Sequence, residues 1–278
     1  MLQPHPETPA VATSAQPAAE RQSVLDLPLA ELQASAPLRW LLRGCVDFHR
    51  CPYIGIFYGS CFFLMGHTLW QVFNHAPAYV LAVSAGFLLL GPFLCLGLYA
   101  ASRDLEQGRA PRLTSSLLAW RPSLASMAIF AAVLLILEML WGRASLVVFA
   151  VTMKTLPAGG NIAALVLESG NLEFIFAYTA VATFFGGLIF LSSAISIPMI
   201  LDRETDAISA ALTSFRACLQ NPGVMLLWAA LVAGLTVIAI VPGFLGILVI
   251  GPVLGHASWH AYREITSPAA AEAQNSAR

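Results

Sequence analysis

Two histidines four residues apart, His256 and His260, are the residues of this sequence best suited to chemistry. In a helix they would share one face, so their imidazoles could ligate a metal ion or a haem. Alternatively, both form hydrogen bonds to neighbouring helices or lipid headgroups, because Trp259, Tyr262 and Arg263 beside them are typical of a membrane interface. We favour this alternative and expect no cofactor, with haem or metal binding as the weaker interpretation.

His67 is the other histidine that we expect inside a membrane helix. At 1.5 Å of rise per residue it lies about 12 Å out of level with His256, which argues against one haem bridging their helices. Glu138 is the one carboxylate within an expected membrane helix, and such acids are candidates for transport or proton relay. Because Glu138 lies three residues before Trp141, near the outer interface, it could instead reach water or Arg143.

Three more polar candidates, Asp202, Arg203 and Arg263, lie at expected cytoplasmic helix ends, where anchoring and ion pairing are sufficient to explain them. Glycines also recur four residues apart in two expected helices, a spacing that lets helices approach closely. These glycines are Gly55, Gly59, Gly251 and Gly255. We find no phosphate-binding loop, nucleophile elbow, HExxH motif or basic nucleic-acid patch, so neither an enzyme nor a nucleic-acid partner is expected.

Charged residues are few in this sequence, and they occur in clusters. Hydrophobic residues make up 58% of the 278 residues and charged residues only 10%, whereas an ordinary soluble domain is about a quarter charged. No Lys, Arg, Asp or Glu occurs between Arg50 and Arg103, or between Arg216 and Arg263. A soluble fold needs charges on the outer face of each element, so the sequence predicts an all-α, multi-pass membrane protein whose surroundings are a lipid bilayer.

A bilayer core takes about 20 apolar helical residues to cross, and we predict six such spans. They are residues 53–73, 79–101, 124–141, 174–201, 224–240 and 244–262. Twelve of the fourteen Lys and Arg residues then lie on one side, which predicts that both termini lie in the cytoplasm.

The spans also suggest an internal repeat. Short amphipathic stretches precede the first, third and fifth spans, at residues 38–48, 113–120 and 207–219. We infer three units, each an interfacial helix followed by a membrane hairpin. The predicted domain covers residues 37–266, between disordered tails at 1–36 and 267–278. The sequence leaves the conformation of the outer segment, residues 142–172, open.

Four segments resemble an uncharacterised family of predicted bacterial integral membrane proteins. They are SIPMILDRETDA (196–207), GPFLCLGLY (91–99), NPGVMLLWAAL (221–231) and GHASWHAYR (255–263). The resemblance covers about residues 38–265 and implies no activity, although some members are labelled cytochrome c oxidase subunit I. A haem-copper centre needs more helices and more membrane histidines than His67, His256 and His260 provide, so the label would imply an accessory or assembly role at most.

Three functional hypotheses follow. The first is a non-catalytic scaffold, accessory or assembly component of a membrane complex, such as a respiratory one, with other subunits or further copies of this chain as partners. The second is a small-molecule transporter or permeation pathway that uses Glu138 or the histidines. The third and weakest is a haem- or metal-binding protein that uses His256 and His260.

Overall fold

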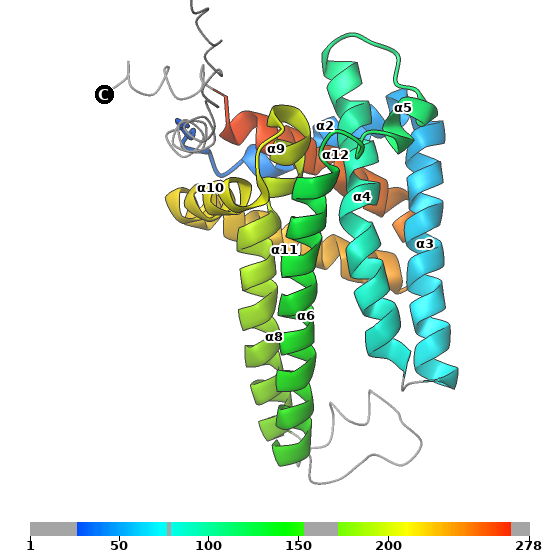
Figure 1. Ribbon diagram of the computed structural model, residues 1–278, viewed down its shortest axis with the longest axis vertical. Coiled ribbons are helices and arrows are strands. Elements are labelled where there is room, and N and C mark those ends of the chain that lie inside the picture. The colour runs from blue at the N-terminus through cyan, green and yellow to red at the C-terminus, as the bar shows by residue number, and fades with distance from the viewer. Residues whose placement is uncertain (1–26, 77–78, 153–171, 268–278) are drawn as a thin grey trace, which may run out of the picture.

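A computed structural model describes residues 27–76, 79–152 and 172–267 of the chain (Figure 1). Within these ranges all the regular structure is helical, which confirms the predicted all-α class. The helices are α2 (Ala36–Arg50), α3 (Pro52–His75), α4 (Val80–Glu106), α5 (Leu113–Leu117), α6 (Leu124–Thr152), α8 (Leu172–Ser193), α9 (Ser196–Arg203), α10 (Ala207–Gln220), α11 (Pro222–Ile240) and α12 (Ile247–Ile265).

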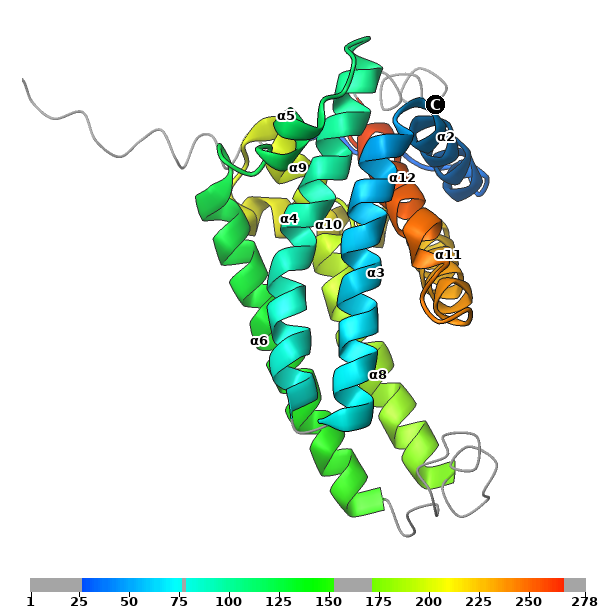
Figure 2. The same cartoon turned by 90° about the vertical axis from the view of Figure 1, so that its right-hand side faces the viewer.

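Four long helices, α3, α4, α6 and α8, run along the long axis of the molecule (Figures 1 and 2). α3 and α4 form one antiparallel pair, α6 and α8 form another, and contacts between α4 and α6 join the pairs. Their length and apolar composition follow from the uncharged stretches of the sequence, because a helix of this kind satisfies its own backbone hydrogen bonds in lipid.

The helices α2, α10, α11 and α12 are inclined to this axis. α11 runs across the molecule in Figure 1 and is seen nearly end-on in Figure 2. α12 packs most extensively against α2 and α3, and it also contacts α4. The repeat predicts three equivalent hairpins. The structure has two hairpins along the long axis, whereas the third pair, α11 and α12, lies at an angle to them.

Four stretches are long and apolar enough to cross a membrane, by length and composition, among the described residues. They are Ala82–Glu106, Leu124–Thr152, Leu172–Arg203 and Pro222–Ile240. The two remaining predicted spans form α3 and α12, which carry more polar side chains. Several membrane helices are therefore shown, while the count of six and the cytoplasmic side of the termini stay predictions.

Prolines explain several helix boundaries. Pro52 and Pro222 occupy the first turns of α3 and α11, where the missing N–H costs no helical hydrogen bond. Pro198 has no N–H for the carbonyl of Ala194, and the predicted span at 174–201 is accordingly divided into α8 and α9.

The three predicted amphipathic stretches lie at α2, α5 and α10, directly before the helices that they were expected to precede. α6 is longer than the predicted span at 124–141, because the helix continues through the apolar run at 146–151 to Thr152. The rest of the outer segment up to residue 171 lies outside the described residues, as do residues 1–26 and 268–278 of the predicted tails.

The main hydrophobic core lies where the inclined helices meet the long ones. Trp40 of α2, Trp228 of α11 and Trp259 of α12 are almost fully buried there, and the rings of Trp40 and Trp228 meet edge to face at 5.5 Å. In contrast, the apolar faces of α6 and α8 are widely exposed, with Phe176 at 74% and Phe184 at 62%. Such surfaces suit contact with lipid.

Residues 27–35, the last part of the predicted N-terminal tail, pack against the domain. The side chain of Asn221 accepts from the N–H of Leu32 at 2.8 Å and donates to the carbonyl of Ala30 at 3.0 Å. The N–H of Ala30 donates to the carbonyl of Ile265 at 3.0 Å. The beginning and the end of the described chain therefore meet at one end of the molecule.

Candidate functional site

His256 and His260 on α12 are joined to Asp47 of α2 and Ser102 of α4. The Ser102 hydroxyl donates to Oδ2 of Asp47 at 2.8 Å and lies 2.7 Å from Nδ1 of His256, while Nε2 of His260 lies 2.9 Å from the same Asp47 oxygen. These four side chains, which we name the Asp47 network, link three helices. Because the Ser102 proton goes to Asp47, the hydroxyl oxygen accepts from Nδ1–H of His256.

The Asp47 network is buried. Ser102 and His256 are 0% exposed and Asp47 is 5% exposed. Burial by itself would raise the pKa of the Asp47 carboxyl, but hydrogen bonds from His260 and Ser102, together with the nearby imidazole charge, hold that pKa below its ordinary value of 3.8. The carboxylate is therefore ionised at neutral pH, and its donors compensate much of the cost of burying it.

Ser, His and Asp also form hydrolase triads, but the order of contacts here differs. In a triad the carboxylate orients the histidine, which in turn activates an accessible serine. Here Asp47 accepts from Ser102 and pairs with His260, while Ser102 and His256 have no exposed surface. The arrangement holds α2, α4 and α12 together and offers no accessible nucleophile.

A second group of polar contacts, the Glu106 network, lies at the end of α4. Glu106 accepts from Nε1 of Trp259 and from Nε of Arg263, each at 3.0 Å. Arg263 also lies 3.5 Å from Oδ2 of Asp202, and the Tyr262 hydroxyl donates to that oxygen at 2.7 Å. One carboxylate from α4 and one from α9 thus bind the last turns of α12.

Arg203 completes this network, because its Nε donates to the Tyr262 hydroxyl at 3.2 Å. The structure therefore brings together Asp202, Arg203 and Arg263, which come from α9 and α12. Beside them, an Arg103 guanidinium nitrogen donates to the carbonyl of Leu201 at 3.2 Å. These contacts hold helix ends together across three elements.

A third contact ties α2 to the end of α12. Glu264 accepts from a guanidinium nitrogen of Arg39 at 2.6 Å and from Nε1 of Trp40 at 3.1 Å. Trp40 is fully buried, so its indole N–H needs such a partner. The polar residues in the second half of α12 are thus bonded to α2, α4 and α9.

Glu138 lies away from these networks. It is half-buried on α6 and lines a cavity of about 550 Å³ together with Arg143 of the same helix and Ala82 and Ala85 of α4. No ion pair joins Glu138 to Arg143 among the described contacts, although both line the same cavity.

His67 is also separate from the other two histidines. It is exposed on α3, where its ring stacks on Phe63 at 5.7 Å and its Nε2 lies 3.2 Å from Nε2 of Gln71. It lines a cavity of about 370 Å³ beside Phe244 and the turn between α11 and α12, whereas His256 lies further along α12 against Ser102. The structure does not bring the three membrane histidines together.

All four predicted contact glycines lie against a neighbouring helix. A Cβ on Gly59 would come within 2.2 Å of the Leu248 carbonyl oxygen, and one on Gly255 within 2.5 Å of the Leu98 side chain. The equivalent contacts are Phe48 for Gly55, at 2.5 Å, and Phe62 for Gly251, at 3.2 Å. At Gly59 the neighbour is backbone, which has little room to yield.

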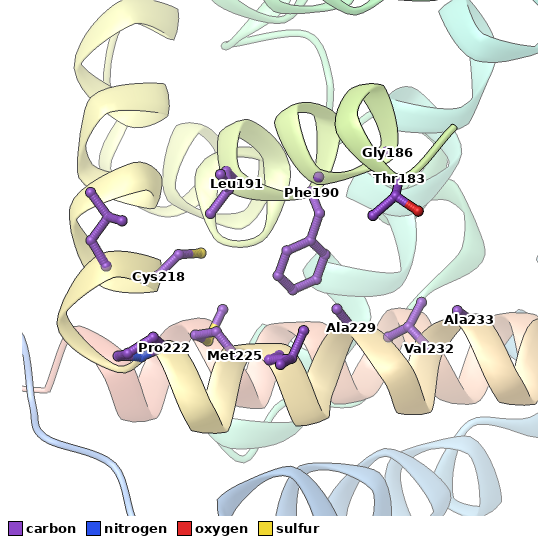
Figure 3. Close-up of a pocket in the computed structure, with 13 residues that line it drawn as sticks. Thr183, Gly186, Phe190, Leu191, Cys218, Pro222, Met225, Ala229, Val232 and Ala233 are labelled. Carbon is purple, nitrogen blue, oxygen red and sulfur yellow. The ribbon is translucent and has the colours of Figure 1, made fainter. Parts of the chain in front are cut away.

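An apolar groove lies between α8, α10 and α11, with a volume of about 680 Å³ (Figure 3). Phe190 and Leu191 of α8, Cys218 of α10 and Met225 of α11 point toward it in Figure 3. Its lining contains no charged residue. The groove therefore suits an apolar occupant and offers no acid or base for catalysis.

With this geometry in place, the chain can be compared with known proteins. Residues 80–202 match the model of a family described as predicted integral membrane protein (DUF2189). This confirms the predicted membrane family over that segment. No curated protein and no solved structure matches the chain. The matched segment holds α4, α5, α6, α8 and all but the last residue of α9, so Ser102, Glu106 and Asp202 lie inside it, whereas Asp47 and His256 lie outside.

The description of DUF2189 names no cytochrome oxidase. Nε2 of His260 pairs with Asp47, and His256 offers only Nε2, which is buried without a hydrogen-bond partner. No three His, Cys, Asp or Glu side chains in the described part of the chain are grouped to hold a metal ion.

The sequence interpretation missed Asp47, Ser102 and Glu106. A signal for Asp47 was present, because it follows Trp40 by seven residues and so shares the face of α2 that packs on α12. An acid on that face requires a buried partner. Ser102 and Glu106 carried no such signal, because a serine and a glutamate at the end of a membrane helix are ordinary.

Proposed function

We propose that this chain is a non-catalytic scaffold, accessory or assembly component of a larger complex in a bacterial inner membrane, with six membrane helices and both termini in the cytoplasm. The observation that carries the proposal is that the polar side chains of the chain form hydrogen bonds and ion pairs between its own helices. Within the Asp47 network and within the Glu106 network, these side chains bond to one another across helices, and the groove between α8, α10 and α11 is lined by uncharged residues.

This distribution favours a structural role over catalysis. A catalytic acid, base or nucleophile must reach a substrate, yet Ser102 and His256 are 0% exposed. Removing one partner of such a buried pair costs folding free energy, so the networks make one arrangement of α2, α4, α9 and α12 strongly preferred. A rigid helical frame of this kind is what a scaffold requires.

The apolar groove of Figure 3 supports the same proposal. Small residues from two helices line it, among them Gly186 and Gly187 of α8 and Ala229 and Ala233 of α11. Membrane helices associate closely where small residues allow their backbones to approach, so the groove suits an apolar membrane helix of a partner subunit.

Gentle detergent extraction of the tagged full chain, followed by identification of the proteins that stay bound, tests the proposal. We expect a reproducible membrane partner. Ala229→Trp, which fills the groove, should release it. Val237→Trp is the matched control, because Val237 is 61% exposed on the same helix but does not line the groove. If every extraction yields this protein without a partner, the proposal is contradicted. If Ala229→Trp and Val237→Trp retain the partner equally, the groove is not the binding site of that partner.

One observation favours transport as a second candidate. Glu138 and Arg143 line the same cavity between α4 and α6, and intramembrane charges commonly lie on permeation pathways. In vesicles reconstituted with the purified chain, Glu138→Gln should then abolish uptake of a substrate that the unaltered chain carries. Uptake that is unchanged in Glu138→Gln would exclude this residue from transport.

A further inference from the structure

Helix α2 exposes a continuous row of large apolar side chains. Leu38, Leu42 and Val46 follow one another at four-residue spacing and are 56%, 67% and 48% exposed. This spacing places them on one face of the helix. Water disfavours such a face, whereas the boundary between headgroups and acyl chains accommodates it.

The opposite face of α2 is fixed, so the row cannot turn inward. Gly44 lies so close to α12 that a Cβ would come within 2.6 Å of the Val253 carbonyl oxygen and 2.8 Å of the Ala257 nitrogen. Asp47 pairs with His260 on the same side. The helix lies near the end of the molecule where α3 begins and α4 ends (Figures 1 and 2), as an interfacial helix would.

Two arginines lie along one flank of the apolar row. Arg43 and Arg50 are exposed and seven residues apart, which is close to two helical turns and keeps them on one side. Neither has an acidic partner among the described residues, in contrast to Arg39, which pairs with Glu264. Arg43 and Arg50 therefore present two uncompensated guanidinium groups beside an apolar surface.

A third basic residue lies nearby. The Tyr53 hydroxyl, three residues after Arg50, donates to the carbonyl of Pro111, which adjoins Arg112. Arg112 likewise has no acidic partner in the described part of the chain. The positive charge at the end of α2 is thus extended by a loop from a distant part of the sequence.

We propose that α2 is an in-plane membrane helix that binds acidic phospholipid headgroups through Arg43 and Arg50, with Leu38, Leu42 and Val46 among the acyl chains. The guanidinium group matches the oxygens of a lipid phosphate in shape and charge. The apolar row inserts α2 among the acyl chains, and the arginines make the helix prefer acidic lipids to neutral ones. The site requires membrane insertion of the chain and does not depend on whether the chain is a scaffold or a transporter.

Cys45 provides a natural probe, because it is exposed on α2 beside the apolar row of Leu38, Leu42 and Val46. In a variant whose other four cysteines are replaced by alanine, a fluorophore on Cys45 reports contact with brominated lipids in nanodiscs. Brominated phosphatidylglycerol should reach half-maximal quenching at a lower mole fraction than brominated phosphatidylcholine, by about five-fold per arginine that contributes. Arg43→Gln or Arg50→Gln should reduce this difference, and Arg43→Lys should largely keep it.

Arg143→Gln on α6 is the control, because it removes the same charge far from α2 and should leave the quenching difference unchanged. Native mass spectrometry of the acidic lipid retained by the chain with all its cysteines gives a second measurement if the cysteine-free background does not fold. Equal quenching by the two lipids, with equal lipid retention in Arg43→Gln and Arg143→Gln, would overturn the headgroup site. A Cys45 label quenched by neither lipid would overturn the in-plane placement of α2.

Discussion

Replacing Asp47 by alanine removes the common acceptor of the Asp47 network. The side chain of Asp47 is 7% exposed and that of His260 15% exposed, so their pair lies in the range of buried interactions. Breaking a buried pair by removing one partner costs about 3–5 kcal/mol. We expect the lower end, about 3 kcal/mol, because His260 keeps some access to water and can recover part of its hydration.

For a domain of this size, a loss of 1 kcal/mol lowers the melting temperature by roughly 2–4 °C. Asp47→Ala should therefore unfold roughly 6–12 °C below the unaltered chain in mild detergent, as followed by tryptophan fluorescence. The control is Asp104→Ala, which removes the exposed pair between Asp104 and Arg109 and should cost no more than about 1 kcal/mol.

The effect should also depend on pH in a defined direction. The pKa of Asp47 is lower in the folded chain than its ordinary value of 3.8, so the unfolded chain binds the proton more tightly. The stabilisation is present above pH 3.8 and is lost as the pH falls through the lower folded value. The gap between Asp47→Asn and the unaltered chain should shrink as the pH falls below 3.8. If Asp47→Ala melts within 2 °C of Asp104→Ala at pH 7, the structural role given to the network is refuted.

Two further variants and one labelling experiment test the packing. Gly59→Ala places a Cβ against the Leu248 carbonyl and should lower the free energy of unfolding by about 1–3 kcal/mol. Gly86→Ala, whose Cβ would meet nothing within 4 Å, should leave that free energy unchanged or raise it by up to about 1 kcal/mol. The melting temperatures of the two variants measure both effects. A maleimide at pH 7 should label exposed Cys45 quickly and Cys218 slowly in the folded chain, because burial raises the pKa of the Cys218 thiol to about 12. Equal labelling rates before and after unfolding would contradict the burial of Cys218.

Hydropathy and prolines predicted where the long helices lie. The spans at 53–73, 79–101 and 224–240 correspond to α3, α4 and α11, with boundaries that differ by a few residues. This works because a lipid-facing helix must be apolar over its whole length, which leaves a signal that needs no knowledge of neighbours.

The same signal could not predict the angles between helices. α11 is as apolar as a spanning helix, yet it runs across the long axis of the molecule. Its direction depends on contacts with α10 and α12 and on Trp228 packing against Trp40. Such contacts join residues far apart in sequence, and a hydropathy profile contains no information on them.

The candidate site was predictable only in part, for a related reason. The four-residue spacing of His256 and His260 predicted a shared face. In the structure His260 bonds to the Asp47 carboxylate, and His256 bonds to the Ser102 hydroxyl that donates to this carboxylate. The identity of that carboxylate, Asp47, depends on α2 crossing α12 where Gly44 lets the backbones approach. A single sequence shows each partner but not the crossing point.

The polar character of α12 also bears on how many helices lie in the membrane. Between residues 251 and 265 only Arg263 is exposed, and His256, His260 and Trp259 bond to side chains of α2 and α4. Membrane helices with internally satisfied polar groups need not be apolar, because protein and not lipid surrounds those groups. The lower hydropathy of α12 therefore reflects its position among other helices, and it is compatible with the six-helix arrangement that we propose.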